Sequence, residues 1–266
     1  MPGPRTIVVT GSASGMGAAT AALLRDDGHR VIGVDQHDAD VVADLATAAG
    51  RSAAIERVTE LADGRLDGLV TWAGISGLAK FAGSLLVSVN YFGTVDLLEG
   101  LRPLLAAGDA PAAVAISSNS TTCFPGPPLA VTDACLAGDE AAARVAGDAA
   151  GSLGCYPATK LAVARWVRRQ APSPEWAGAG ITLNAVAPGA VETPLLQASR
   201  EDPVIGAFVD AFPVPIGRPG RAEELAAFVR FLLGPEARYF CGSVLTVDGG
   251  TDALLRADDM PDPMPG

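Results

Sequence analysis

The 266-residue chain is poor in the residues that build metal sites and disulfide frameworks. It has only two histidines and four cysteines, and no two of the cysteines form a C-x-x-C pair. These counts argue against a zinc site or any other bound metal, and we expect reduced thiols. No apolar run reaches the roughly 18 residues of a membrane-spanning helix, so no membrane association is expected.

Basic residues are also scarce. Lysine and arginine total 19 against 30 aspartates and glutamates, which gives a net charge of −11. A nucleic-acid backbone requires a basic face, so no nucleic-acid partner is expected. Residues 1–5 lack the apolar stretch and the small-residue cleavage site of a signal peptide, and we therefore expect a cytoplasmic protein.

Apolar runs typical of strands alternate with helical patterns along the whole chain. The expected helices span residues 15–27, 47–62, 85–106, 156–170 and 222–233. The expected strands span residues 5–10, 30–35, 41–44, 66–72, 112–118, 181–186 and 243–247. Continuous apolar strands separated by helices indicate strands that are buried on both faces. The predicted fold class is α/β, a Rossmann-type doubly wound parallel sheet of seven strands in a single domain.

A glycine-rich turn separates the first strand from the first helix. It contains Gly11, Ser14, Gly15, Met16 and Gly17. Glycines there permit a tight turn and let a pyrophosphate approach bare backbone at the positive end of the helix. An ordinary strand-to-helix turn is the alternative, because glycine is abundant in this chain.

An acidic residue, Asp35, ends the second predicted strand. A carboxylate at this place can accept both hydrogen bonds of an adenosine ribose diol and would repel a 2′-phosphate. No arginine or lysine in the turn or at residues 36–38 could neutralise such a phosphate. The predicted cofactor is therefore NAD rather than NADP, and the alternative for Asp35 alone is a solvated loop acid.

The segment 156–160 joins one of the three tyrosines to one of the two lysines. Tyr156 and Lys160 are four residues apart in a predicted helix, so they share one face. An ammonium group beside a phenol lowers the phenol pKa, which makes the tyrosine a usable acid and base, and the lysine can also hold ribose hydroxyls. An exposed helical pair is the alternative, and the scarcity of both residue types weighs against it.

Two serines end the fifth predicted strand. A hydroxyl there can hydrogen-bond a substrate carbonyl, and strand alternation directs Ser117 and Ser118 to opposite faces. The alternative is simple capping of the strand end.

These motifs, in this order, resemble the short-chain dehydrogenase/reductase family from Thr10 to Gly250. The resemblance implies four catalytic residues, namely Asn90, Ser118, Tyr156 and Lys160. It implies further cofactor contacts at Asp44, Leu45, Ala73, Gly74, Pro188, Gly189, Val191 and Thr193. Asn90 would hold a proton-relay water, although a mid-helix asparagine that bonds its own backbone is about as plausible. Trp72-Ala73-Gly74 stands where the family has Asn-Asn-Ala-Gly, which puts the bracing role of that motif in doubt.

An insertion separates the predicted serine and tyrosine. They are 38 residues apart, and residues 119–153 contain a helical stretch at 139–150. Such insertions resemble those of the bacterial 3α-hydroxysteroid dehydrogenase/carbonyl reductase subgroup. We expect the insertion to block the helix-bundle dimer contact common in the family and to help wall the active site. A second variable loop, residues 194–217, has helical apolar spacing and is either a packed helix or a lid over an apolar substrate.

The sequence therefore predicts an NAD-dependent oxidoreductase that interconverts a secondary alcohol and a ketone on an apolar substrate, with a 3α-hydroxysteroid as one candidate. A generic carbonyl, terpenoid-alcohol or quinone reductase is the main alternative. A non-catalytic NAD-binding regulator is disfavoured, because it would not need serine, tyrosine and lysine in order. We expect one domain over residues 1–255, a disordered tail at 256–266, and assembly as a homodimer or homotetramer.

Overall fold

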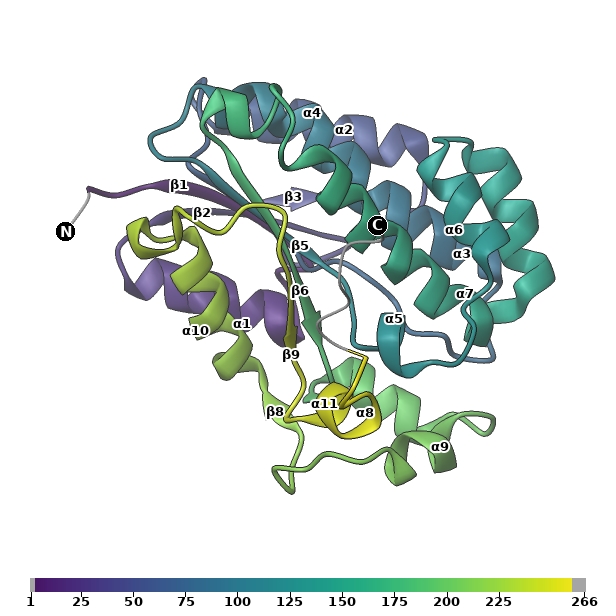
Figure 1. The fold of residues 1–266 in the computed structure, drawn as a ribbon. Helices are drawn as coiled ribbons and strands as arrows, with labels where there is room; N and C mark the ends of the chain where they lie inside the picture. The colour runs from purple at the N-terminus through teal and green to yellow at the C-terminus, as the bar shows by residue number, and fades with distance from the viewer. Residues whose placement is uncertain (1–2, 260–266) are drawn as a thin grey trace, which may run out of the picture.

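The computed structural model describes residues 3–259 and contains the parallel sheet expected from the sequence (Figure 1). All pairings are parallel, in the order β3-β2-β1-β4-β5-β6-β9. The strands are β1 (Thr6–Thr10), β2 (Arg30–Asp35), β3 (Val41–Val42), β4 (Gly68–Thr71), β5 (Ala112–Ile116), β6 (Thr182–Pro188) and β9 (Val244–Val247). The predicted doubly wound α/β fold with seven strands is confirmed.

The strand order reverses at β1. Thr10, the last residue of β1, faces Val34 of β2 on one side and Thr71 of β4 on the other. The chain winds outward through β2 and β3 and then crosses back to begin the second half at β4. Open α/β sheets bind ligands at such a reversal, outside the carboxyl ends of the strands.

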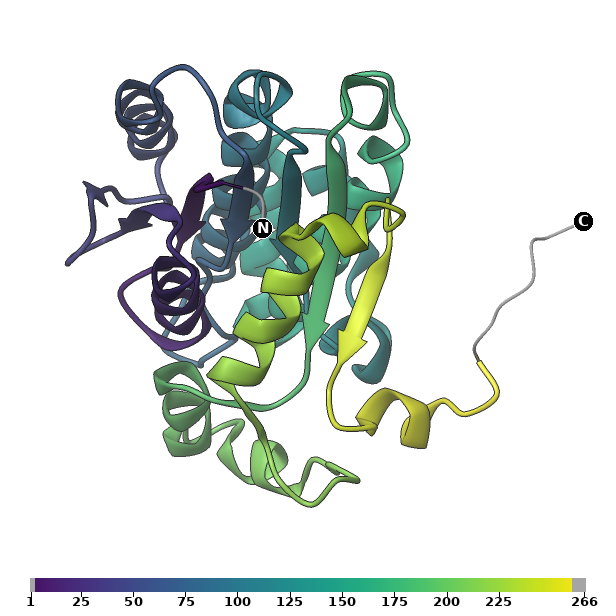
Figure 2. The same ribbon diagram turned by 90° about the vertical axis from the view of Figure 1, so that its left-hand side faces the viewer.

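Helices cover both faces of the sheet (Figures 1 and 2). α1 (Gly15–Asp26) and α10 (Ala222–Leu233) cover one face, and α2 (Ala48–Leu61), α4 (Gly93–Ala106) and α7 (Glu140–Gln170) cover the other. β1 shows how alternation divides the core. Ile7 and Val9 pack with α1 and α10, whereas Val8 packs with the opposite layer.

The segment expected as one helix over residues 85–106 is interrupted. α3 (Gly83–Leu86) passes into a π-helical turn, η1 (Val87–Phe92), before α4 begins. All six residues of η1 are buried. Since every residue of this turn is buried, it has no exposed polar face from which the change of helical period could be recognised, and such turns are frequent at functional sites.

The insertion folds into helices that pack on the body. α5 (Ser120–Cys123) and α6 (Leu129–Leu136) precede α7, which breaks at Gly151 (φ 67°, ψ 167°). The predicted helices at 139–150 and 156–170 are therefore the two halves of α7. Thr132 of α6 donates a hydrogen bond to the Ala158 carbonyl of α7 over 3.0 Å, and its side chain is fully buried.

The second variable loop lies at the carboxyl ends of the strands (Figure 2). It contains α8 (Pro194–Glu201) and α9 (Gly206–Ala211), and a two-stranded sheet flanks it. That sheet, β7 (Val191–Glu192) with β8 (Gly220–Arg221), was not expected from the sequence. The remaining elements are η2 (Ala177–Ala179), η3 (Pro235–Ala237) and α11 (Thr251–Leu255).

The tail was expected to be disordered over residues 256–266. Arg256, at its start, pairs with Asp252 and Asp259 at 3.2 Å each. Residues 260–266 lie outside the described part of the chain.

Candidate active site

Three adjoining cavities of about 200, 100 and 190 Å³ form one cleft at the carboxyl ends of the strands. We call them the turn cavity, the central cavity and the apolar cavity. The turn and central cavities share Met16, Trp72 and Thr193 in their walls. The central and apolar cavities share Ser118 and Tyr156. The cleft thus connects the glycine-rich turn to the predicted catalytic residues and then to an apolar space.

The glycine-rich turn is bare backbone at the points of closest approach. Gly11 has a φ of +67°, and a Cβ there would lie 2.9 Å from the Ala73 nitrogen. A Cβ on Gly17 would lie 2.0 Å from the Gly11 oxygen. Ser14 precedes α1 without a side-chain capping bond, so first-turn N–H groups of the helix remain for an anion. Close backbone packing therefore requires glycine at both positions, and the first-turn N–H groups of α1 at the edge of the turn cavity fit the pyrophosphate of a dinucleotide.

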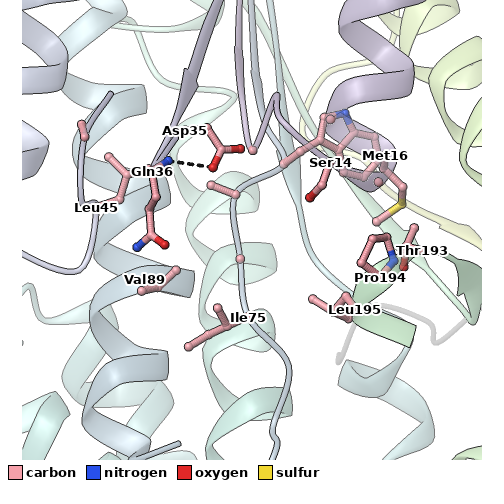
Figure 3. A pocket seen from close by; sticks show the side chains of 17 residues that line it. Ser14, Met16, Asp35, Gln36, Leu45, Ile75, Val89, Thr193, Pro194 and Leu195 are labelled. Atoms are coloured by element: carbon pink, nitrogen blue, oxygen red, sulfur yellow. Dashed lines mark hydrogen bonds between the residues drawn. The ribbon is translucent and has the colours of Figure 1, made fainter. Parts of the chain in front are cut away.

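Asp35 is fixed by the turn that it faces. Its Oδ2 accepts a hydrogen bond from the Ala13 N–H at 2.9 Å. Its Oδ1 accepts one from the Gln36 N–H at 2.7 Å, the bond drawn in Figure 3. Each carboxylate oxygen keeps a further lone pair for the diol of an adenosine ribose. No arginine or lysine is among the described residues that line the turn cavity, so nothing there would neutralise a 2′-phosphate.

Asp44 and Leu45, both expected at the cofactor, separate in the structure. Leu45 is buried and lines the turn cavity, as expected of an adenine contact. Asp44 is exposed and lies outside the cavity wall, and its Oδ1 accepts hydrogen bonds from the Ala46 N–H at 3.0 Å and from Gln36 Nε2 at 3.3 Å. Asp44 therefore acts on the cavity only through Gln36, which itself lines it.

Trp72 and the residue after it make hydrogen bonds that connect β4 to neighbouring elements. Its indole Nε1 donates to Thr20 Oγ1 over 2.9 Å, and Thr20 Oγ1 donates to the Met16 carbonyl over 2.7 Å. The neighbouring Ala73 N–H donates to Thr10 Oγ1 over 3.0 Å. The motif that lacks the family asparagines thus ties β4 to α1 and to the end of β1 by different hydrogen bonds.

Asn90 lies in the π turn and is fully buried. Its Oδ1 accepts from the Ile75 N–H at 2.9 Å, and its Nδ2 donates to the Ile75 carbonyl at 3.0 Å. A Cβ placed on Gly74 would lie 3.2 Å from Asn90 Oδ1 and 3.3 Å from Lys160 Nζ. The structure therefore brings Asn90 close to Lys160, although its side chain is occupied by Ile75 and it does not line the cleft.

The serine, tyrosine and lysine meet in the central cavity. Ser117 Oγ donates to the Lys160 carbonyl over 3.0 Å, which ties β5 to α7. Ser118, on the alternate side, lines the central cavity together with Tyr156. Lys160 is 3% exposed, and its Nζ donates to the Ile116 carbonyl over 3.3 Å. The cleft thus holds one hydroxyl donor, one phenol and one amine around a small space.

Burial is the largest influence on the pKa values of Lys160 and Tyr156. It lowers the pKa of Lys160 from its ordinary value to about 7. It also raises the pKa of Tyr156, and the neighbouring Ser118 hydroxyl opposes that shift. The expected lowering of the Tyr156 pKa by Lys160 is therefore not found, because desolvation penalises the phenolate and the ammonium alike.

The remaining predicted cofactor residues surround the same space. Pro188, Gly189, Val191 and Thr193 line the central cavity, and Ala73 and Gly74 line the turn cavity. Several further lining residues of the turn cavity were not among the predicted cofactor contacts. These are Gln36, Ala43, Ile75, Val89, Pro194 and Leu195.

The insertion and the second variable loop together enclose the apolar cavity. Cys123, Phe124 and Leu153 come from the insertion, and Ile205, Phe208, Val209 and Phe212 come from the loop. The helical apolar spacing of these four loop residues pointed to either a packed helix or a lid, and the structure places them in the cavity wall, whereas the contact between the two segments could not be read from the sequence. The cavity opens directly onto Ser118 and Tyr156.

Within residues 3–259, no helix is long and apolar enough to cross a membrane. The same residues contain no cluster of three or more metal-ligating side chains. All four cysteines are free thiols.

A glycine cradle at the sheet reversal and a Ser–Tyr–Lys group beside an apolar cavity define a dinucleotide-dependent oxidoreductase. The chain belongs to the short-chain dehydrogenase/reductase family. The family model described as short chain dehydrogenase matches residues 5–128, and that described as Enoyl-(Acyl carrier protein) reductase matches residues 141–252. The unmatched stretch between them contains α6, which lies within the insertion.

Individual relatives are similar over almost their full length. The 3-alpha-hydroxysteroid dehydrogenase/carbonyl reductase of Comamonas testosteroni is 43% identical over 94% of this chain and 97% of its own. A coniferyl-alcohol dehydrogenase of Pseudomonas sp. (strain HR199 / DSM 7063) is 33% identical over 92% of this chain and 96% of its own. The crystal structure of the 3-alpha-hydroxysteroid dehydrogenase from Pseudomonas sp. B-0831 complexed with NADH superposes with a TM-score of 0.92, at 47% identity, over 96% of this chain and 100% of that one. The expected resemblance to the hydroxysteroid dehydrogenase subgroup is thereby confirmed.

Proposed function

We propose that this protein is an NAD-dependent oxidoreductase that interconverts a secondary alcohol and a ketone on an apolar substrate, with 3α-hydroxysteroids as the leading candidates. The observation that carries the proposal is the position of Ser118 and Tyr156 in the walls of both the central and the apolar cavities. A substrate oxygen beside these two residues leaves its apolar body in the apolar cavity. The similarity to a 3-alpha-hydroxysteroid dehydrogenase/carbonyl reductase supports the steroid class.

The turn cavity would hold the dinucleotide, and Asp35 favours NAD. When bound, NAD supplies a carbon that accepts or returns hydride. Ser118 donates a hydrogen bond from its hydroxyl to the substrate oxygen and stabilises negative charge there. Tyr156 exchanges the hydroxyl proton of the substrate through its phenolic oxygen. Lys160 sits behind this pair, and its pKa of about 7 lets it gain or lose a proton near neutral pH.

Asn90 would act beside Lys160, either through a relay water or by holding Ile75 in place. We further propose one catalytic domain over residues 1–255 and assembly as a homodimer or homotetramer in the cytoplasm. Because α6 packs against α7, the insertion would keep a second subunit from using the helix-bundle contact common in the family. A generic carbonyl reductase remains the second candidate, since one relative carries that activity in its name.

The proposal is tested with a panel of 3α-hydroxysteroids, terpenoid alcohols and simple secondary alcohols, with NAD or NADP, by the absorbance of the reduced nicotinamide. We expect NAD-dependent oxidation of the steroids, and loss of turnover in Tyr156→Phe with NAD affinity largely kept. The exposed Tyr239→Phe serves as the matched control. Turnover of Tyr156→Phe within about tenfold of the parent, a loss of about 1.4 kcal/mol or less, would contradict its assigned role.

A further inference from the structure

Besides the polar side chains of Ser118, Asn119, Ser120 and Tyr156, the wall of the apolar cavity contains two serines that face each other. Ser76 follows β4 and Ser199 lies in α8, and their side chains face each other across 123 positions of sequence. They are 7% and 6% exposed. No charged residue is among the described residues that line this cavity. Buried hydroxyls in such a place need hydrogen-bond partners, so their bonds can be counted.

The count leaves one hydrogen-bonding position on Ser76 unused. Ser199 Oγ lies 2.8 Å from the Leu195 carbonyl and 3.2 Å from Ser76 Oγ. Each hydroxyl has one proton and two lone pairs. If Ser199 donates to Leu195, Ser76 donates to Ser199 and keeps its own lone pairs free. If Ser199 instead donates to Ser76, the Ser76 proton is free.

The serine pair is held in place next to the catalytic tyrosine. Ser76 precedes Gly77, where a Cβ would lie 3.1 Å from the Cβ of Tyr156. The segment containing Ser76 is bound to the loop after α8, because the Ala79 N–H donates to Asp202 Oδ2 over 2.9 Å. The two sides of the cavity that carry the serines are therefore fastened together at a second point.

We propose that Ser76 and Ser199 form a second polar subsite, which binds an uncharged oxygen of the substrate other than the reacting one. The inference rests on the proposed function and narrows it to apolar alcohols or ketones that carry a second hydroxyl or carbonyl. Ser76 accepts from a hydroxyl in one arrangement of the pair and donates to a carbonyl in the other. A carboxylate or phosphate would find no opposite charge there, because no cationic side chain is among the described residues that line the cavity.

The test compares a saturated 3-ketosteroid that has no other oxygen with derivatives that carry one further hydroxyl or carbonyl at successive ring positions. Two quantities are measured: kcat/KM with NADH, and the Kd of each ketone for the enzyme–NAD complex, in which the ketone cannot be reduced. We expect at least one derivative to be preferred about tenfold over the parent ketone in both. In Ser76→Ala and Ser199→Ala, the ratio between the preferred derivative and the parent ketone falls close to one in both quantities. The kcat/KM and Kd of the parent ketone stay within about twofold of their original values. Ser76→Thr, which keeps the hydroxyl, retains the preference, and Ser52→Ala on the exposed side of α2 is the control.

If Ser76→Ala lowers kcat/KM equally for the parent ketone and for its derivatives, the subsite proposal is wrong. It is also wrong if the preference for a derivative survives the substitution. Absence of a preferred derivative would overturn it as well. Failure of the proposed function is distinguishable, because it removes turnover of every steroid while the Kd comparison still decides the subsite. If no steroid binds the enzyme–NAD complex, both proposals are wrong.

Discussion

The side-chain amide of Asn90 holds the peptide group of Ile75 from both sides, with its Oδ1 2.9 Å from the Ile75 nitrogen and its Nδ2 3.0 Å from the Ile75 oxygen. This pairing fixes the loop between β4 and α3 against the π turn. The same loop contains Gly74, whose missing side chain leaves room for Lys160 Nζ. Asn90 therefore shapes the wall of the cleft whether or not it also holds a relay water.

Asn90→Leu removes both hydrogen bonds and keeps the branched shape and the number of heavy atoms of the side chain. Ile75 is only partly buried, so water can reach part of its peptide group, and we expect the free energy of unfolding to fall by about 1–3 kcal/mol. Urea unfolding measures this, and the KM for NAD should rise because Ile75 lines the turn cavity. Unchanged stability together with a fall in kcat alone would mean that Asn90 serves a water relay and not the loop.

Lys160 makes the stability of the fold depend on pH. Its folded pKa of about 7 lies below the ordinary value of 10.5, so between these limits the unfolded state binds more protons than the folded state. The contribution of Lys160 to the free energy of unfolding therefore rises with pH across that window, with a slope of up to about 1.4 kcal/mol per pH unit. Outside the window this contribution is constant. Lys160→Met should lack this contribution. Denaturant titrations of both proteins at pH 7.5 and 9.5 compare the slopes, and parallel curves would contradict the lowered pKa.

The sequence predicted the fold and most of the cleft because those features depend on local pattern. Buried parallel strands are continuously apolar, as β1 and β5 are, and the four-residue spacing of Tyr156 and Lys160 places both on one helical face. The glycine-rich turn requires glycine at Gly11 and Gly17 for the steric reasons found in the structure. Local constraints of this kind can be read from one chain.

Features that depend on distant contacts could not be predicted. Nothing in the local sequence shows that Asn90 bonds Ile75, or that Ser76 meets Ser199. The opposite pKa direction of Tyr156 arises from burial by segments that are far away in the chain, which helical spacing does not reveal. Asp44 was expected at the cofactor, but a short β3 turns its side chain to solvent and leaves Leu45 inside.

Asp35 should decide between the two nicotinamide cofactors. Asp35→Ala removes a carboxylate that is held toward the turn by Ala13 and would accept the ribose diol. We expect kcat/KM for NAD to fall about 10- to 100-fold, since a hydrogen bond to a charged group contributes about 1.5–3 kcal/mol, and activity with NADP to rise. Steady-state kinetics with both cofactors measure the ratio of kcat/KM for NAD to kcat/KM for NADP. Asp38→Asn, on an exposed side chain of the same loop, should leave this ratio unchanged. A parent enzyme that prefers NADP would refute the assignment.

Arg51 links the cofactor side of the molecule to the insertion. Its guanidinium is 2% exposed, pairs with Asp96 of α4 at 2.6 Å and with Glu140 of α7 at 2.5 Å, and donates to the Leu45 carbonyl over 3.2 Å.

Breaking a fully buried ion pair costs about 3–5 kcal/mol, and the partial exposure of both carboxylates reduces that figure here. We expect Glu140→Gln to lower the free energy of unfolding by about 1–3 kcal/mol, and Arg51→Met also to raise the KM for NAD through the wall residue Leu45. Glu56→Gln, an exposed residue of α2, is the matched control in the same urea titration. If Glu140→Gln unfolds at the same urea concentration as this control, the insertion is held to the body by apolar packing and not by Arg51.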